Sequence, residues 1–167
     1  PLATAPGPEL DGAVEVASLK GARCLLCCSD APGYVGLGSC GHADVCWVCI
    51  LRLRALSRDF KCPVCKEELE DVLLTNDLSR PFSAGSLKGL VHDAAHGVYF
   101  ADARIRTLAS ELFGYQCGLD RCEGCSECCF GTLRELENHM WYSHWQQFCR
   151  VCLYGRPAFL SEQHVYG

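Results

Sequence analysis

The sequence lacks an apolar run long enough to cross a membrane, and it lacks an excess of positive charge. A transmembrane helix needs about 20 consecutive apolar residues, so we expect no membrane partner. The chain carries 15 Lys and Arg against 20 Asp and Glu, which gives a formal net charge of -5 at pH 7. A protein whose main task is to grip the phosphate backbone is usually basic. RNA is therefore a weaker prospect as a partner, although a local basic patch is still compatible with it.

The N-terminus also lacks the basic start and apolar run that are typical of a secretory signal peptide. Residues 1–21 begin PLATAPGPEL, and this composition, rich in Pro, Gly and Ala, favours a disordered leader. We therefore expect a cytoplasmic location. In a reducing compartment, clustered thiols and imidazoles bind metal more often than they form disulfides.

Cysteine, by contrast, is abundant, with 15 residues in a chain of 167. Such a composition favours small modules held by metal over one large apolar core. The cysteines form three groups, at residues 24–65, 117–129 and 149–152, and residues 66–116 contain none. That cysteine-free stretch has to fold by ordinary apolar burial.

Two β-rich runs and one helical pattern lie in the cysteine-free stretch. ELEDVLLTND alternates briefly and ends in turn-forming residues, and GVYFAD is a second strand candidate. ARIRTLASELFG places Ile105, Leu108, Leu112 and Phe113 on one helical face and ends at Gly114, which is suited to a helix C-terminus. We predict a small α/β linker segment over residues 69–114.

The first cysteine group contains eight ligand-type residues, enough for two tetrahedral zinc ions. Their order is Cys24-x2-Cys27-x12-Cys40-x-His42-x3-Cys46-x2-Cys49-x12-Cys62-x2-Cys65. Closing the sites one after another is the simpler scheme, but the short Cys40-x-His42 pair favours an interleaved one. The predicted sets are Cys24, Cys27, Cys46 and Cys49 for one ion, and Cys40, His42, Cys62 and Cys65 for the other. Four protein ligands leave no open position, so both zinc ions are structural.

This order of ligands resembles the cross-brace RING finger, here over residues 22–68. The resemblance implies a groove for a ubiquitin-conjugating enzyme, with Leu26, Leu53 and Pro63 as its matching apolar residues. It also implies that Lys66, directly after the last ligand, is a cation that positions the charged enzyme, with no covalent catalytic residue on this chain. The plainer interpretations are that Leu26 and Leu53 belong to the core and that Lys66 is a solvated lysine.

The second cysteine group precedes a helical pattern, TLRELENHMWYSH, and together they indicate a two-Cys two-His zinc finger over residues 115–146. His139 and His144 lie near one helical face. We favour Cys122 and Cys125 as the other two ligands, with Cys117 as the alternative. A further metal site that uses Cys117 with other surplus cysteines is also compatible with the sequence.

A last pair, Cys149 and Cys152 in FCRVC, opens another Cys-x2-Cys motif. The fifteen residues after it contain one histidine, His164, to which we assign no role. Residues 147–167 are therefore predicted to be the start of a truncated second finger with an incomplete metal site. The expected fold class overall is a small, zinc-stabilised α+β protein.

The order of these modules narrows the resemblance further. A RING, a segment containing VYFAD, a finger ending LENHMWYSH and then FCRVC resemble the multi-zinc-finger ubiquitin ligases that recognise collided ribosomes. The resemblance implies a RING-type ubiquitin ligase that modifies small-subunit ribosomal proteins in translation quality control. Two other functions stay open: a RING scaffold without ligase activity, and an RNA-binding zinc-finger protein.

Overall fold

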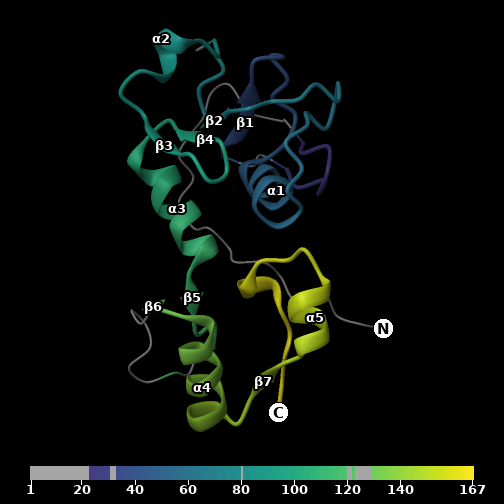
Figure 1. Cartoon of the computed structure of the whole chain (residues 1–167), viewed down its shortest axis with the longest axis vertical. Helices are drawn as coiled ribbons and strands as arrows, with labels where there is room; N and C mark the ends of the chain where they lie inside the picture. The colour runs from purple at the N-terminus through teal and green to yellow at the C-terminus, as the bar shows by residue number, and fades with distance from the viewer. Residues whose placement is uncertain (1–22, 31–32, 80, 120–121, 123–128) are drawn as a thin grey trace.

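The structure is a computed structural model that describes residues 23–30, 33–79, 81–119, 122 and 129–167. The predicted leader, Cys125 and Cys128 lie outside this range. The elements in chain order are β1 (Val35–Gly38), α1 (Trp47–Leu51), the π-helical turn η1 (Arg52–Leu56), β2 (Val72–Thr75), α2 (Ala84–Leu87), β3 (Val91–Asp93), β4 (Val98–Phe100), α3 (Ala103–Phe113), β5 (Tyr115–Gln116), β6 (Cys129–Phe130), α4 (Leu133–His144), β7 (Gln147–Phe148), α5 (Arg150–Gly155), the 3-10 turn η2 (Leu160–Glu162) and β8 (Val165–Tyr166). Figure 1 shows the four-stranded sheet and α1 at one end of the molecule, α4 and α5 at the other, and α3 between them.

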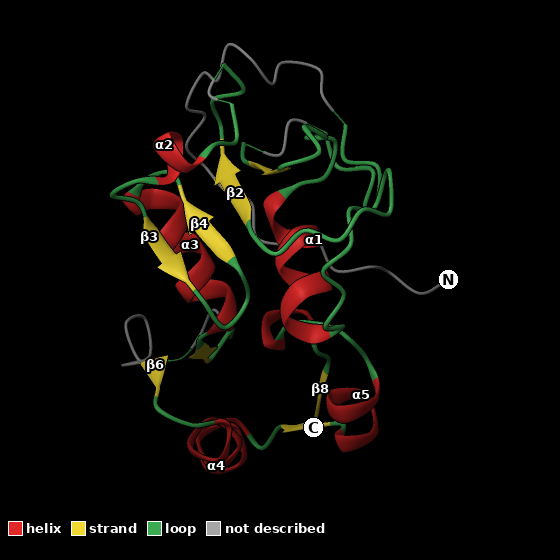
Figure 2. Cartoon of the chain, turned by 45° about the horizontal axis from the view of Figure 1, so that its top comes forward, coloured by secondary structure: helices red, strands yellow, loops and turns green. Residues whose placement is uncertain are grey.

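The predicted RING and linker segments share one four-stranded sheet, with strand order β1-β2-β4-β3. Strand β1 lies within the predicted RING and pairs antiparallel with β2, with Leu37 opposite Leu73. Strand β2 then pairs parallel with β4, and β4 pairs antiparallel with β3 (Figure 2). Backbone hydrogen bonds therefore cross the boundary expected near residue 68.

Strand β2 explains why the two segments join. All four of its residues, VLLT, are buried, as expected for a strand that is covered on both faces. Val72 and Leu74 belong to one core cluster with residues of the RING and the linker. This cluster extends to Phe159, near the C-terminus, which is 3% exposed.

Helix α3 forms where its apolar spacing predicts. The Asp102 carboxylate caps its first turn and accepts hydrogen bonds from the backbone N–H groups of Arg104, at 2.8 Å, and Ile105, at 3.0 Å. Ile105 is fully buried, and Leu108, Leu112 and Phe113 pack against the core. Gly114 ends the helix as predicted, but its backbone is extended, with φ -67°, instead of left-handed.

Helix α4 also matches its prediction, and its two ends are defined by polar contacts. The Thr132 hydroxyl accepts from the backbone N–H of Glu135 at 3.3 Å, and the Glu135 carboxylate accepts from the N–H of Gly131 at 2.8 Å. At the other end Trp145 adopts a left-handed conformation, with φ 55°, and its N–H donates to the carbonyl of Trp141. The helix therefore presents His139 and His144 from a well-capped scaffold.

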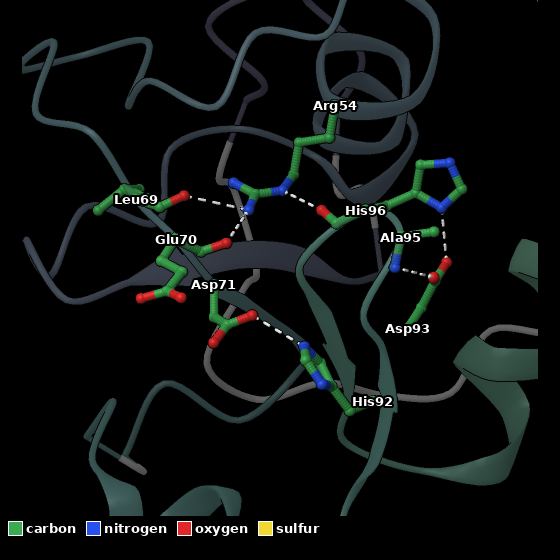
Figure 3. A network of polar contacts seen from close by, with 8 residues as sticks. All are labelled: Arg54, Leu69, Glu70, Asp71, His92, Asp93, Ala95 and His96. Atoms are coloured by element: carbon green, nitrogen blue, oxygen red, sulfur yellow. Dashed lines mark hydrogen bonds and ion pairs between the residues drawn. The ribbon is translucent and has the colours of Figure 1, made fainter.

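A buried arginine ties the RING helix to the linker. Arg54 is 3% exposed and donates to the backbone carbonyls of His96, at 2.5 Å, Leu69, at 3.1 Å, and Glu70 (Figure 3). Burial lowers the pKa of this guanidinium, and the three carbonyls supply the acceptors that a buried cation needs. Its planar fork therefore connects two parts of the chain that the sheet also joins.

Gly97 makes room for this arrangement. Its φ is +62°, and a Cβ there would collide with the Glu70 carbonyl and the Arg54 guanidinium. We expect Gly97→Ala to lower the free energy of unfolding by about 2 kcal/mol or more, because it adds left-handed strain and a backbone clash. Denaturant unfolding of the zinc-loaded protein measures this loss. Gly155→Ala, at a glycine with open space around it, is the control, and an equal loss in both variants would contradict the packing described.

Candidate zinc centres and the surface around them

The first candidate zinc centre consists of Cys24, Cys27, Cys46 and Cys49, whose ligand atoms all lie within 4.8 Å of one another. Cys46 precedes the first turn of α1 and Cys49 lies inside the helix, so the helix fixes both sulfurs. The backbone N–H of Cys46 donates to the Sγ of Cys24 at 3.3 Å. These contacts bring the first and third ligand pairs of the sequence to one point.

The second candidate centre consists of Cys40, His42, Cys62 and Cys65, again within 4.8 Å. The Nδ1 of His42 lies 3.8 Å from the Sγ of Cys62. The second and fourth ligand pairs therefore meet, and the two groups alternate along the chain as the spacing predicts. The stretch CGHADVCWVC serves both groups, which is why it contains three cysteines and a histidine.

Two turns of matching geometry supply half of these ligands. In the first turn the N–H of Cys28 donates to the carbonyl of Cys24 at 2.9 Å, and in the second the N–H of Lys66 donates to that of Cys62, also at 2.9 Å. Cys28 and Lys66 both have positive φ, 59° and 65°. We call these turns, residues 24–28 and 62–66, the first and second knuckle. Cys28 is exposed and stands outside the metal-type groups found among the described residues.

The chemistry of the first centre fits a divalent cation. A hydrogen bond from the Cys49 thiol lowers the pKa of Cys46 to about 7, and the same bond raises the pKa of Cys49. Four thiols this close share their protons, because each new thiolate repels the next. Zinc relieves that repulsion by binding thiolates directly, and it favours tetrahedral sulfur and nitrogen ligands.

The third candidate centre lies between β5 and α4. Its members are Cys117, Cys122, His139 and His144, within 4.8 Å, and the Nε2 atoms of the two histidines are 3.2 Å apart. The group contains Cys117, the alternative of the sequence interpretation, whereas the favoured Cys125 lies outside the described residues. A short β5–β6 ladder, which pairs Tyr115 with Phe130, sets the start of this finger.

Cys149 lies directly before α5, and Cys152 lies in the first turn of that helix. The backbone N–H of Cys152 lowers the pKa of Cys149, which favours the thiolate that a metal needs. Within the part of the chain that the structure describes, no group of three or more metal-type ligands includes this pair. The β7–β8 ladder pairs Phe148 with Val165 and holds the end of the chain beside this turn.

His92 and His96 are paired with carboxylates, a feature that sequence reasoning missed. The Nε2 of His92 lies 2.8 Å from Asp71, and the Nδ1 of His96 lies 2.7 Å from Asp93 (Figure 3). Their rings stack on Tyr99 and on Phe113. These contacts explain their presence without a metal, and neither histidine joins a metal-type group among the described residues.

Of the residues that the RING resemblance singles out, Leu26, Pro63 and Lys66 lie on the knuckles, and Leu53 lies in the turn η1. Leu26, on the first knuckle, is 47% exposed, and Val64, on the second, is 40% exposed. Pro63 and Leu53 are half-buried. Lys66 is exposed, and its Nζ donates to the carbonyl of Pro63 at 2.9 Å. Apolar side chains that the core leaves uncovered are therefore present on both knuckles.

Comparison with known proteins agrees with this geometry. The model of the ZNF598 RING finger domain matches residues 20–111. The human E3 ubiquitin-protein ligase ZNF598 is 33% identical over 86% of this chain, and the mouse protein is 32% identical over 92%. The E3 ubiquitin-protein ligase HEL2 of Saccharomyces cerevisiae is 26% identical over 86%. The chain belongs to the ZNF598 RING finger family.

The matched region is a small part of these relatives. It covers 15% of the human protein, 16% of the mouse protein and 22% of the yeast protein. No solved structure matches the chain significantly. Among the described residues, no helix combines the length and apolar character that a membrane span requires.

The interleaved centres predict which cysteines the fold depends on. Cys46→Ser should unfold the RING as completely as Cys24→Ser, because both sulfurs belong to one zinc centre that contributes about 10 kcal/mol or more of apparent binding free energy. Cys28→Ser, next to a ligand but outside the group, should keep the wild-type melting temperature within about 2 °C. Thermal melting with and without a chelator measures this. A Cys46→Ser protein that melts like wild type would contradict the interleaved arrangement.

Proposed function

We propose that the chain is the RING and first-finger region of a RING-type E3 ubiquitin ligase, which recruits a ubiquitin-conjugating enzyme charged with ubiquitin and promotes transfer to substrate lysines. The observation that carries this proposal is the pair of interleaved Cys/His groups. The two knuckles that supply half of their ligands also expose apolar side chains to solvent. The relatives named above are E3 ubiquitin-protein ligases, which supports the same activity here.

The zinc ions in this proposal are structural. Cys24, Cys27, Cys46 and Cys49 would hold one ion, Cys40, His42, Cys62 and Cys65 the second, and Cys117, Cys122, His139 and His144 the third. Each ion has a full set of four protein ligands, so its contribution is to fix the knuckles and not to activate water. Leu26, Pro63 and Leu53 then form the contact surface for the conjugating enzyme.

Lys66 acts by position in this mechanism. Its backbone is left-handed and makes it the last residue of the second knuckle, and its ammonium donates to the Pro63 carbonyl at 2.9 Å. From there a second or third hydrogen bond of the same ammonium reaches acceptors on the bound enzyme and ubiquitin. Holding the thioester in a reactive arrangement accelerates attack by the substrate amine without a nucleophile on this chain.

The substrates that we propose are small-subunit ribosomal proteins of collided ribosomes, modified in the cytoplasm. The support is the arrangement of a RING, a shared linker sheet and following fingers in a chain of this family. Beside α4, a hollow is lined by Arg134 and Arg150, by the aromatic residues Trp141 and Tyr142, and by the carboxylate of Glu137. The two arginines and the aromatic rings are the residue types that support RNA contact as a secondary function. A RING scaffold without ligase activity is the remaining alternative, and it predicts no binding to any charged conjugating enzyme.

The Lys66 role yields a kinetic prediction. Lys66→Ala should slow discharge of ubiquitin from the conjugating enzyme onto free lysine by about ten-fold, a loss of about 1.4 kcal/mol of transition-state stabilisation. Affinity for the conjugating enzyme and zinc content should stay close to wild type, because the contact matters mainly in the reactive arrangement. Single-turnover discharge at saturating ligase measures the effect.

Two variants serve as controls for this measurement. Lys66→Arg keeps a cation and should retain most of the activity, and Lys61→Ala removes an exposed lysine from the other side of Cys62 and should be neutral. Equal discharge rates for wild type and Lys66→Ala, with several competent conjugating enzymes, would show that this lysine is a solvated charge.

A further inference from the structure

The RING helix ends in a wide turn that points neighbouring side chains in different directions. The backbone N–H of Ser57 donates to the carbonyl of Arg52 at 3.2 Å, which closes the π-helical turn η1 over Arg52–Leu56. Such turns are uncommon and occur frequently at functional sites. Leu53, which we assign to the conjugating-enzyme groove, lies in this turn between Arg52 and Arg54.

Arg54 fixes one side of the turn. Its guanidinium donates to three carbonyls of the linker, as described above, and it also lies 4.6 Å from the ring centroid of Phe60. Because Gly97 leaves no space beside it, this side chain has one well-packed position. The hydrogen bonds of Arg54 therefore hold the turn against the loops before β2 and β4.

Arg52 fixes the other side, through a segment far along the chain. Its guanidinium forms an ion pair with Glu162 and lies 5.5 Å from the ring centroid of Phe159. The second carboxylate oxygen of Glu162 accepts from the backbone N–H of Phe159 at 2.9 Å. Phe159 is 3% exposed and packs edge-on against Phe113 of α3, with ring centroids 5.6 Å apart.

The anchoring residues have no other evident role in the sites described so far. The segment 159–162 follows α5 and packs against α3, and Phe159 belongs to the same core cluster as residues of the RING helix. It brings one carboxylate to an arginine that is partly exposed, with 29% of its side chain accessible. A partly exposed ion pair contributes little to stability. Together with the Phe159 ring, however, Glu162 gives the Arg52 side chain a defined orientation.

We propose that Arg52 and Arg54 are positioning residues for the ubiquitin-transfer reaction: the linker and residues 159–162 hold the turn that carries Leu53 in the orientation that the conjugating enzyme binds. This proposal rests on the proposed ligase function. It makes the affinity of the RING for the charged enzyme depend on a segment that follows the finger region. A displacement of that segment weakens the enzyme contact without loss of zinc.

A charge exchange between Arg52 and Glu162 tests the positioning role. The assay is binding of the whole chain to a conjugating enzyme that carries ubiquitin through a stable isopeptide bond. Arg52→Glu and Glu162→Arg should each raise the Kd by about five-fold, while zinc content and the unfolding midpoint stay near wild type. The double variant should restore binding, which a purely local structural defect in either residue does not predict. Glu111→Arg, an exposed carboxylate on α3, is the matched control for added positive charge.

Leu53→Ala separates this proposal from the proposed function. If Leu53→Ala weakens binding and both single charge reversals leave the Kd unchanged, the groove stands and the positioning role is wrong. If Leu53→Ala has no effect, or wild type binds no charged enzyme, the groove assignment fails and the positioning proposal fails with it. Single variants that bind weakly and a double variant that binds no better would also overturn the proposal, because the pair would not act as a unit. Hydrogen exchange of residues 52–57 should rise in each single variant and return to wild type in the double variant.

Discussion

Closure of the interleaved zinc centres is the constraint on which the rest of this structure depends. Each RING centre combines ligands from distant parts of residues 24–65, so neither forms until the chain between them has taken its path. That path places β1 beside β2, and it brings Arg54, after the RING helix, to the backbone carbonyls of the linker. Metal binding is thus coupled to the formation of the sheet and of the core around Leu51 and Leu74.

The parts of the fold that could be predicted from the sequence are those that follow from the chemistry of the metal ligands and from the local spacing of apolar residues. The alternating order of the eight RING ligands, the strands at VLLT and VYF, and the helices α3 and α4 all follow from short-range spacing. The choice between Cys117 and Cys125 did not, because neighbouring cysteines have the same chemistry and differ only in loop geometry. The groups that contain the RING ligands and His139 agree with a zinc-stabilised α+β fold.

Long-range polar contacts had no comparable signal. Arg54 reads in sequence as an ordinary surface charge, yet it is buried on backbone carbonyls, and carbonyls leave no mark in the sequence. Arg52 meets Glu162 across more than half of the chain, and nothing in FLSEQ indicates that it returns to the RING. Gly97 is the one local hint, since a glycine beside a buried strand often marks a close backbone approach. Contacts of this kind join the RING, the linker and the C-terminal segment to one another.

The central claim is that twelve ligands hold three zinc ions, two in the RING and one in the finger. Native mass spectrometry of the whole chain, paired with Cys117→Ser, tests it most directly. We predict three tightly held zinc ions in wild type and two in the variant, with the RING still folded. Two ions in wild type, or three tightly held ions in the Cys117→Ser protein, would contradict this set of ligands.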